Sequence, residues 1–467
     1  MFVRQSRNTY IRLWEELGYI ENQANHLSKV CRGDELSFLK ALSREEQTIE
    51  EIMKKTGLTL ESVMAFIDEY ERLWFLVVGD SSKELSGKEH SFSYKTLASI
   101  EALFKDVELD DKVQLDRPWL RSLQLEITSQ CNERCIHCYL PTDNRSHGGF
   151  MSTGMVKSII DQFADINGLR VVLSGGEVLL HKDVFEIMDY CRQKDMMILL
   201  QSNVILLDDD KIARLKELDL FNVQISLYST TPKTHDSITK LPGSWEKTTN
   251  NIKRLVQNDI PVLISCPIMS LNYKGYKDMI RFCENLNIYC YVDYILMAQS
   301  DMCTDNLCAR LSLKQTSELI DDLLEYSPNF KSKLHSIKSE QEIDTTPFAQ
   351  RFIKCDILKS NLGITVKGDA YPCPGWQSMV LGNIFKQSLS FIWYDSETTN
   401  EIRSIKPNDF KKCAECELHN YCDMCMVYNY NESGGDIFKI CDRFCETAQL
   451  LKQKIKAKYH KINEQLE

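Results

Sequence analysis

Short apolar runs recur through the middle of the chain and alternate with longer amphipathic stretches. They span residues 123–127, 169–173, 196–200, 223–227, 262–268 and 289–295 and are rich in residues that favour strands. The stretches between them carry apolar residues at the three- and four-residue spacing of helices. The pattern predicts six consecutive βα units and therefore an α/β fold around a parallel sheet.

The first 80 residues follow a different pattern. Segments 3–7, 9–14 and 18–22 are predicted to form a small β-arm, followed by helices with N-caps at Ser43, Thr48 and Thr59. Glu51 would complete a capping box with Thr48. The helix after Thr59 is expected to carry an aromatic and aliphatic face made of Phe66, Tyr70, Leu73 and Trp74. This arrangement is typical of a winged helix, and the polar residues that follow predict a linker.

Composition and charge exclude several classes of protein. The chain has 467 residues, of which 43% are hydrophobic and 26% charged, enough for about three globular domains. A net charge of −11 argues against nucleic-acid binding, which depends on Lys and Arg neutralising phosphates. No apolar run approaches 18 residues and the N-terminus has no signal-peptide pattern, so we expect a cytoplasmic protein with no membrane partner.

Eighteen cysteines in a chain without an export signal predict metal ligands rather than disulfides. Three lie directly after the first predicted strand, and eight lie between residues 355 and 445. The other seven are scattered and are expected to act as small core side chains, namely Cys31, Cys191, Cys266, Cys283, Cys290, Cys303 and Cys308.

Cys131, Cys135 and Cys138 form a CxxxCxxC run. Three closely spaced thiolates suit iron, and this spacing lets one loop reach three corners of a [4Fe–4S] cluster. The fourth iron is then left without a protein ligand and is able to take a small molecule. Structural zinc is the alternative, although it normally has four protein ligands and no fourth Cys or well-spaced His follows locally.

This loop resembles that of the radical S-adenosylmethionine (radical SAM) enzymes, which implies a partial (β/α)6 barrel. In that family SAM chelates the open iron and is cleaved to a 5′-deoxyadenosyl radical that abstracts hydrogen. The resemblance assigns SAM contacts to Gly175, Gly176 and Glu177 after the second strand, and to Asn203 and Ser226 at the ends of the third and fourth. For Asn203 and Ser226, capping of a strand end is an equal alternative. Tyr228 stands where the family commonly has Asp.

The C-terminal cysteines resemble the SPASM domain, which holds two auxiliary [4Fe–4S] clusters and would bring the total to three. The resemblance assigns one cluster to Cys413, Cys416, Cys422 and Cys441, and the other to Cys355, Cys373 and Cys425. The fourth ligand of the latter stays open between Cys445, a water and a substrate thiolate. Paired CxxC motifs also occur in zinc ribbons, so mixed iron and zinc content is the alternative.

The N-terminal segment resembles the recognition element of enzymes that modify ribosomally made peptides, where a leader peptide adds a strand to the β-arm. The predicted domains are a winged-helix-like recognition element over 1–80, a linker over 81–116, the radical SAM partial barrel over 117–298, a helical connector over 299–350 and the SPASM domain with a C-terminal helix over 351–467.

Together these resemblances imply a radical SAM oxidoreductase that installs a thioether, carbon–carbon or ether cross-link in a precursor peptide bound through its leader. Flavodoxin or ferredoxin is the expected electron donor. The alternatives are a peptide epimerase with Cys303 or Cys308 as hydrogen donor, a sulfatase-type protein-maturing enzyme, and a non-catalytic iron–sulfur or zinc scaffold that binds a peptide. The target residues and the bond formed do not follow from the sequence.

Overall fold

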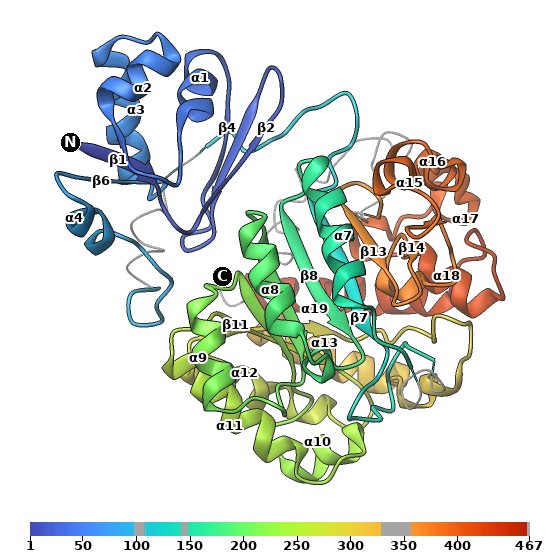
Figure 1. Cartoon of the computed structure of the whole chain (residues 1–467). Coiled ribbons are helices and arrows are strands. Elements are labelled where there is room, and N and C mark those ends of the chain that lie inside the picture. Colours follow the sequence, from blue (N-terminus) through green and yellow to red (C-terminus); the bar gives the residue numbers. More distant parts are fainter. Residues whose placement is uncertain (98–106, 108, 142–147, 328–354, 356, 465–467) are drawn as a thin grey trace.

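Six parallel strands, adjacent in chain order, form the centre of the molecule (Figure 1). The computed structural model describes residues 1–97, 107, 109–141, 148–327, 355 and 357–464. The strands are β7 (Ser122–Thr128), β8 (Arg170–Gly175), β9 (Met197–Ser202), β10 (Asn222–Ser226), β11 (Val262–Pro267) and β12 (Tyr289–Asp293). Each overlaps one of the six predicted runs, because a strand buried on both faces is apolar along most of its length.

Helices connect successive strands and pack along the outer face of the sheet (Figure 1). This arrangement confirms the predicted α/β fold with a partial (β/α)6 barrel. The helices are α7 (Thr153–Asp165), α8 (Val184–Gln193), α9 (Asp209–Glu217), α10 (Pro232–Thr239), α11 (Ser244–Gln257), α12 (Tyr276–Asn285) and α13 (Leu313–Tyr326), with 3-10 turns η1 (Val178–Leu180), η2 (Tyr273–Gly275) and η3 (Asp305–Ala309).

The C-terminal region extends the same sheet. Strand β13 (Asn361–Ile364) pairs in parallel with β7, and β14 (Asp369–Tyr371) and β15 (Gly382–Asn383) add to it in antiparallel order. The sequence did not predict this continuity, since β13 is short and contains Gly363. That glycine is needed because a Cβ there would lie 2.0 Å from the ring of Tyr371. The predicted barrel and SPASM regions therefore share one sheet.

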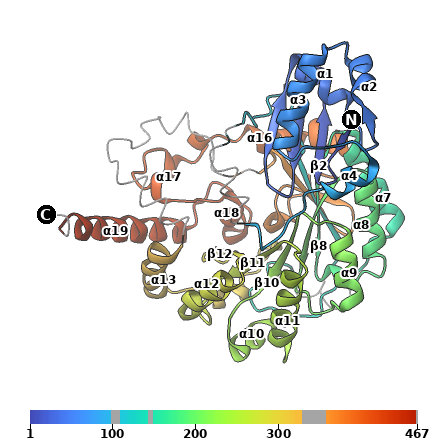
Figure 2. The same cartoon turned by 90° about the vertical axis from the view of Figure 1, so that its left-hand side faces the viewer.

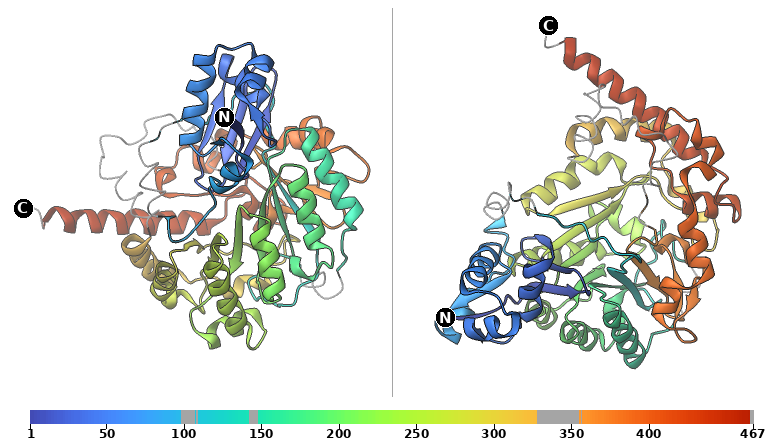
Figure 3. Two further views of the ribbon diagram at one scale, coloured as in Figure 1. Left: turned by 60° about the vertical axis from the view of Figure 1, so that its left-hand side comes forward. Right: turned by 90° about the horizontal axis from the view of Figure 1, so that it is seen from above.

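Short helices and a long terminal helix complete the C-terminal region. They are η6 (Pro374–Trp376), α15 (Leu389–Tyr394), α16 (Glu397–Ser404), η7 (Pro407–Asp409), α17 (Lys411–Ala414), η8 (His419–Tyr421), α18 (Met426–Ser433) and α19 (Asp442–Glu464). Leu451 and Ile455 of α19 pack on Ile320 and Leu324 of α13. Beyond this contact α19 extends away from the molecule (Figure 2), and its far end projects clear of the N-terminal module (Figure 3).

The N-terminal module contains two small sheets and three helices. One sheet joins β1 (Phe2–Gln5) to β5 (Gln47–Thr48) and β6 (Leu76–Gly79), and the other joins β2 (Thr9–Leu13), β3 (Gly18–Asn22) and β4 (Ser28–Cys31). The helices are α1 (Gly33–Ala41), α2 (Ile49–Thr56) and α3 (Leu60–Arg72). The predicted β-arm is therefore divided between the two sheets. Its first segment, β1, pairs with β5 and β6, and the unpredicted strand β4 is the third strand beside β2 and β3.

Two of the three predicted helix caps are confirmed. Thr48 forms the capping box with Glu51, and the Thr59 hydroxyl accepts a hydrogen bond from the Ser62 amide at 3.2 Å. The cap at Ser43 was wrong, because its hydroxyl is satisfied inside a bend by the Glu45 amide, at 3.0 Å.

The third helix was also predicted too long. Leu73 is its C-cap, and Trp74 has a φ of 65°, which takes the chain out of the helix. The indole of Trp74 instead stacks on His90, with ring centroids 4.1 Å apart. Only Phe66 and Tyr70 of the predicted apolar face lie within α3.

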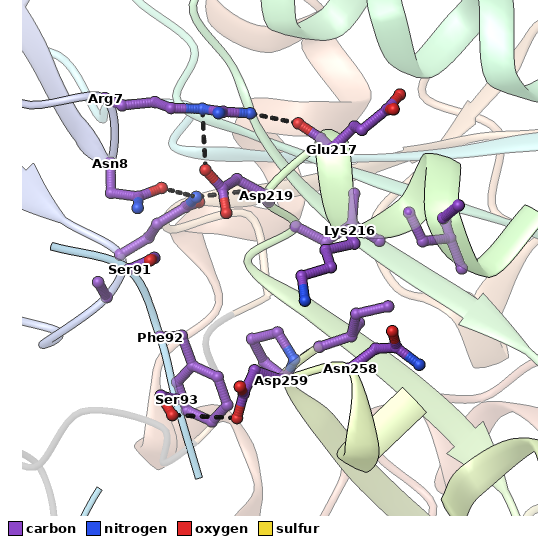
Figure 4. A pocket seen from close by; sticks show the side chains of 17 residues that line it. Arg7, Asn8, Ser91, Phe92, Ser93, Lys216, Glu217, Asp219, Asn258 and Asp259 are labelled. Atoms are coloured by element: carbon purple, nitrogen blue, oxygen red, sulfur yellow. Dashed lines mark hydrogen bonds and ion pairs between the residues drawn. The ribbon is translucent and has the colours of Figure 1, made fainter. Parts of the chain in front are cut away.

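Ion pairs and hydrogen bonds join this module to the amino-terminal ends of the barrel strands. The buried guanidinium of Arg12 donates to the Gly168 carbonyl at 2.6 Å and pairs with Asp195 at 3.1 Å. Figure 4 shows Arg7 reaching across the interface to Asp219, at 2.9 Å, beside a cavity of about 650 Å³. The module therefore sits at the amino ends of the strands.

The two predicted connectors are described only in part. A short helix, α4 (Ser82–Gly87), lies in the region predicted as a linker over 81–116, and its N-cap is Ser81. Residues 98–106 and 108 lie outside the described residues, as do residues 328–350 of the connector predicted over 299–350. Within the described part of the chain, no helix is both long and apolar enough to cross a bilayer.

Candidate functional site

A cavity of about 250 Å³ opens at the carboxyl ends of the barrel strands. In parallel α/β sheets this edge is where ligands bind. The eight residues predicted to contact the first cluster or SAM all line it, although they come from the ends of four strands and the loops that follow them: Cys131, Cys135, Cys138, Gly175, Gly176, Glu177, Asn203 and Ser226. The fold therefore gathers these residues at one cavity, on the side of the barrel opposite the N-terminal module.

Gly175 and Gly176 let the end of β8 approach the backbone that leads into the cysteine loop. Gly175 has a φ of 137°, and a Cβ on it would lie 2.0 Å from the Thr128 carbonyl oxygen. A Cβ on Gly176 would lie 2.1 Å from the Gln130 carbonyl oxygen. The Gly176 amide donates to Thr128 at 2.9 Å. The two glycines thus fix the position of the cysteine loop as well as lining the cavity.

Glu177 holds two strand ends together. Its carboxylate accepts hydrogen bonds from the Leu179 amide at 3.0 Å, the Ser202 hydroxyl at 2.7 Å and the Asn203 amide at 2.8 Å. Its own amide donates to Gln130 at 2.7 Å. Burial raises the pKa of the carboxyl, and the three donors oppose that shift. Glu177 therefore orders the rim of the cavity through the backbone.

Asn203 connects the end of β9 to the cysteine loop. Its side-chain nitrogen donates a hydrogen bond to Asn132 Oδ1 at 2.6 Å, and its side-chain oxygen Oδ1 accepts one from the Ile205 backbone amide at 3.1 Å. The bond to Ile205 is the strand-end capping that the sequence offered as an alternative role for Asn203. Ser226 is the last residue of β10 and lines the same cavity.

Glu133 and Tyr228 also line the cavity, and the sequence did not single out Glu133. Glu133 is 4% exposed, accepts a hydrogen bond from the Cys135 thiol at 3.3 Å, and has an Oε1 atom without a partner among the described residues. Burial raises its pKa to about 7. The Tyr228 hydroxyl lies 3.7 Å from Cys135 Sγ. A charged loop residue is normally exposed, so no sequence signal marked Glu133.

The cavity has the donor set that a cluster and a polar ligand require. It offers three thiols, and the unpartnered Glu133 oxygen is positioned for a hydrogen-bond donor. Burial raises the pKa of the Cys131 thiol to about 12 and that of Cys135 well above its ordinary value. Iron binding would release these protons. In the described residues, no three or more His, Cys, Asp or Glu side chains converge closely enough to hold a single metal ion.

Most of the C-terminal cysteines fall into two groups, and the thiols within each group interact electrostatically with one another. The Cys373 thiol interacts with those of Cys355 and Cys425. A second group consists of Cys413, Cys416, Cys422 and Cys445. Cys441, which the resemblance placed with this second group, lies 3.4 Å from Glu432, and Glu432 is paired with Arg310.

Cys303 and Cys308 lie beside the cysteine loop and do not line the cavity described above. The Cys303 carbonyl accepts a hydrogen bond from the Gln299 amide at 2.9 Å. The amide of Ser300, which follows Gln299, donates to the Tyr139 carbonyl in the cysteine loop at 2.8 Å. Cys308 is exposed on η3. The structure thus brings neither predicted hydrogen donor into the cavity.

A buried carboxyl joins the barrel to the C-terminal strands. Glu126 of β7 accepts hydrogen bonds from the Tyr371 hydroxyl, at 2.8 Å, and from the Gln377 amide. It lines a second cavity of about 460 Å³, which shares Leu140 with the first. Burial raises the pKa of Glu126 to about 7, against the opposing effect of the Tyr371 hydrogen bond.

This raised pKa predicts a pH-dependent stability. Between about pH 4.5 and 7 the unfolded chain releases a proton that folded Glu126 keeps, so stability falls as pH rises through that window, by up to about 1.4 kcal/mol per pH unit. Glu126→Gln should remove this decline. Anaerobic thermal unfolding from pH 5 to 8 measures it, with exposed Glu401→Gln as the matched control. Parallel curves for the wild type and Glu126→Gln would contradict the assignment.

Two segments match known families. Residues 125–283 match the radical SAM superfamily, and residues 355–417 match the SPASM iron–sulfur cluster-binding domain. Among curated proteins, the chain is 23% identical over 341 residues to an AdoMet-dependent heme synthase of Oleidesulfovibrio alaskensis, covering 68% of this chain and 85% of that protein. It is 24% identical over 320 residues to the subtilosin biosynthesis protein AlbA of Bacillus subtilis, covering 68% and 69%.

A solved structure shares the fold over nearly the whole chain. SuiB of Streptococcus suis, bound to its precursor peptide SuiA, superposes with a TM-score of 0.63 at 18% identity. The match covers 95% of this chain and 99% of SuiB. At this identity the likeness concerns the fold.

Proposed function

We propose that this radical SAM enzyme, which carries an SPASM domain, oxidatively cross-links a ribosomally made precursor peptide. The carrying observation is the cavity at the carboxyl ends of the strands, where three thiols, a glycine-lined rim and the buried Glu133 meet. The fold shared with SuiB over 95% of the chain supports a peptide as substrate.

Cys131, Cys135 and Cys138 would hold the first [4Fe–4S] cluster, and Gly175, Gly176, Glu177, Asn203 and Ser226 would form the SAM site. When bound, the cluster and SAM supply a 5′-deoxyadenosyl radical that takes a hydrogen atom from the substrate. Within this site Glu133 Oε1 would accept a hydrogen bond from the ligand, and Glu177 keeps the β8 and β9 ends in place. Tyr228 lies beside Cys135 and would limit the access of water to a bound cluster.

The eight C-terminal cysteines would hold two auxiliary clusters. Closing a cross-link breaks one C–H bond and one S–H, C–H or O–H bond and forms one new bond. One hydrogen atom leaves to the adenosyl carbon, one proton leaves to a base, and one electron must be accepted. Cys355, Cys373 and Cys425 would hold the auxiliary cluster that could take this electron, because β13 and β14 bring Cys373 next to the barrel.

We place the enzyme in the cytoplasm, where thiols stay reduced and where flavodoxin or ferredoxin supplies electrons. The precursor would bind through its leader to the N-terminal module, within the predicted domain 1–80. Such docking raises the effective concentration of the core peptide at the cavity, so that the cavity itself needs little affinity for it.

A tetrapyrrole is the competing substrate class, because one group of relatives is named as heme synthases. The sequence matches to a heme synthase and to AlbA both cover 68% of this chain, so they do not separate the two substrate classes. The fold shared with SuiB over 95% of the chain supports a peptide. Among peptide modifications, epimerisation is disfavoured for two reasons. It leaves no electron for an auxiliary cluster to accept, and it needs a hydrogen donor in the cavity. Neither Cys303 nor Cys308 lines that cavity.

The test is tandem mass spectrometry of the peptide encoded beside this gene. The peptide is incubated anaerobically with reconstituted enzyme, SAM and dithionite in deuterated water. We expect a loss of two hydrogens per link and suppressed fragmentation between the linked residues. A gain of one deuterium without a new bond would mean epimerisation instead, and Cys303→Ala and Cys308→Ala would then identify the donor.

A further inference from the structure

A buried carboxyl of the barrel keeps one of its two oxygens without a partner. Glu126 is 5% exposed and lies on β7, beside β13 and β14 of the C-terminal region (Figure 1). The Tyr371 hydroxyl, at 2.8 Å, and the Gln377 side chain both donate to the same atom, Oε1. Oε2 accepts no hydrogen bond from the described residues, and the side chain lines the second cavity, of about 460 Å³. Oε2 is therefore the oxygen that a group bound in this cavity can reach.

The second cavity lies close to both groups of cysteines that the proposed reaction uses. It shares Leu140 with the first cavity, which Cys138 lines. Tyr139, the residue between these two, interacts electrostatically with Glu126, Cys138 and Cys373. A substrate residue in the second cavity would thus lie near the site where its radical forms and near the cysteines proposed to hold the electron acceptor.

The surroundings of Glu126 keep its carboxyl between its two protonation states. Burial raises its pKa to about 7, and the hydrogen bond from Tyr371 opposes that shift. A base works best when its pKa lies near the working pH, because it is then both ionised and able to hold a proton. The titratable and charged groups around it are Tyr139 of the cysteine loop, Tyr371 of β14, and Asp301, Lys367 and Asp369 at the wall of the cavity.

The other carboxyls near the two cavities already have partners. Glu133 accepts a hydrogen bond from the Cys135 thiol at 3.3 Å and belongs to the loop of the first cluster. Asp369 accepts one from a neighbouring side chain at 2.8 Å, and Asp301, which is exposed, accepts one from a backbone amide at 3.1 Å. Glu126 is the carboxyl of the second cavity that is both buried and able to accept a further bond.

We propose that Glu126 is the base for closure of the cross-link, and that its Oε2 takes the proton of the substrate group that attacks the radical carbon. The inference rests on the proposed function, whose balance leaves this base unassigned. The S–H, C–H or O–H bond of the attacking group breaks, the new bond to the radical carbon forms, the proton goes to Oε2, and the electron leaves to an oxidised auxiliary cluster. Tyr371 and Gln377 hold the carboxyl in place from the other side.

The first measurement detects the contact without turnover. Infrared spectra of the reconstituted enzyme without SAM are recorded from pH 5 to 9, and subtracting those of Glu126→Gln isolates the protonated carboxyl band of Glu126. This band should disappear with a midpoint at about pH 7. The peptide encoded beside this gene, added in excess, should lower that midpoint by about one pH unit, since a donor on Oε2 stabilises the carboxylate. A midpoint that stays in place or rises would overturn the contact.

The second measurement counts cross-links per radical formed. The enzyme reacts with the same peptide carrying deuterated side chains, and mass spectrometry gives the ratio of cross-links to deuterated 5′-deoxyadenosine. Because both products require folded, cluster-loaded protein, a loss of fold or iron lowers them together. Glu126→Gln should lower the ratio on the order of 100-fold, and Glu126→Asp should restore part of it. The wild-type ratio should rise with pH across the midpoint measured with peptide bound. Exposed Glu401→Gln is the matched control.

Failure of this inference is distinguishable from failure of the proposed function. An unchanged ratio in Glu126→Gln, or a loss of cross-links in Asp301→Asn instead, would overturn the role of Glu126 and leave the maturase in place. A wild type that transfers no deuterium to 5′-deoxyadenosine would reject the maturase itself, and Glu126 as its base with it.

Discussion

Cys135→Ala should abolish reductive cleavage of SAM. The Cys135 thiol lies in the cavity between Glu133 and Tyr228, and its replacement removes one of the three proposed ligands of the first cluster. We expect 5′-deoxyadenosine formation with dithionite to fall on the order of 1000-fold, with loss of about four irons per chain. Chromatography of the nucleoside products and iron analysis measure both effects.

Cys308→Ala is the matched control for this experiment, since Cys308 is exposed and does not line the cavity. It should keep the iron content and the SAM cleavage of the wild type. Retention of full activity and iron in Cys135→Ala would contradict the assignment of the cluster. The same loss in Cys308→Ala would mean that the effect is not specific to the proposed ligands.

Gly176→Ala should weaken SAM binding while the auxiliary clusters remain. The added Cβ would lie 2.1 Å from the Gln130 carbonyl oxygen, so either the end of β8 or the cysteine loop must move. Such overpacking costs about 1–3 kcal/mol. If that cost falls on the SAM-bound state, it weakens binding roughly 10- to 100-fold. Equilibrium dialysis with labelled SAM measures the change.

Gly149→Ala is the matched control for this substitution. Gly149 also lies near the cysteine loop, where its carbonyl accepts from the Ser129 amide at 3.1 Å, but the closest atom to an added Cβ is 3.8 Å away. It should bind SAM like the wild type. Unchanged SAM affinity in Gly176→Ala would show that the close approach of β8 to the cysteine loop does not shape the SAM site.

The barrel and its cavity could be predicted because their signals are local. Buried parallel strands give continuous apolar runs, and residues that follow such strands meet at one edge of the sheet. The resemblance to the radical SAM loop singled out Cys131, Gly175, Asn203 and Ser226, and this geometry explains why they meet although they are far apart in sequence. The sequence did not show that Gly175 and Gly176 also permit close contact with the backbone of residues 128–130.

Features that depend on contacts between distant segments could not be predicted. The pairing of β13 with β7, the burial of Glu133 and the interaction of Cys445 with Cys413 and Cys422 have no signal in the spacing of nearby residues. The wrong cap at Ser43 has a local origin instead, because the residue types that begin helices also stabilise bends.

The most direct measurement of the central claim is deuterium transfer from the precursor peptide to 5′-deoxyadenosine. The peptide encoded beside this gene is prepared with deuterated side chains and reacted anaerobically with enzyme, SAM and dithionite. Mass spectrometry of the nucleoside should show one deuterium in each molecule of 5′-deoxyadenosine formed. The peptide should lose that deuterium and one further hydrogen for each cross-link. Undeuterated 5′-deoxyadenosine with an unchanged peptide, together with turnover of an added tetrapyrrole, would contradict the account and assign the enzyme to the other substrate class.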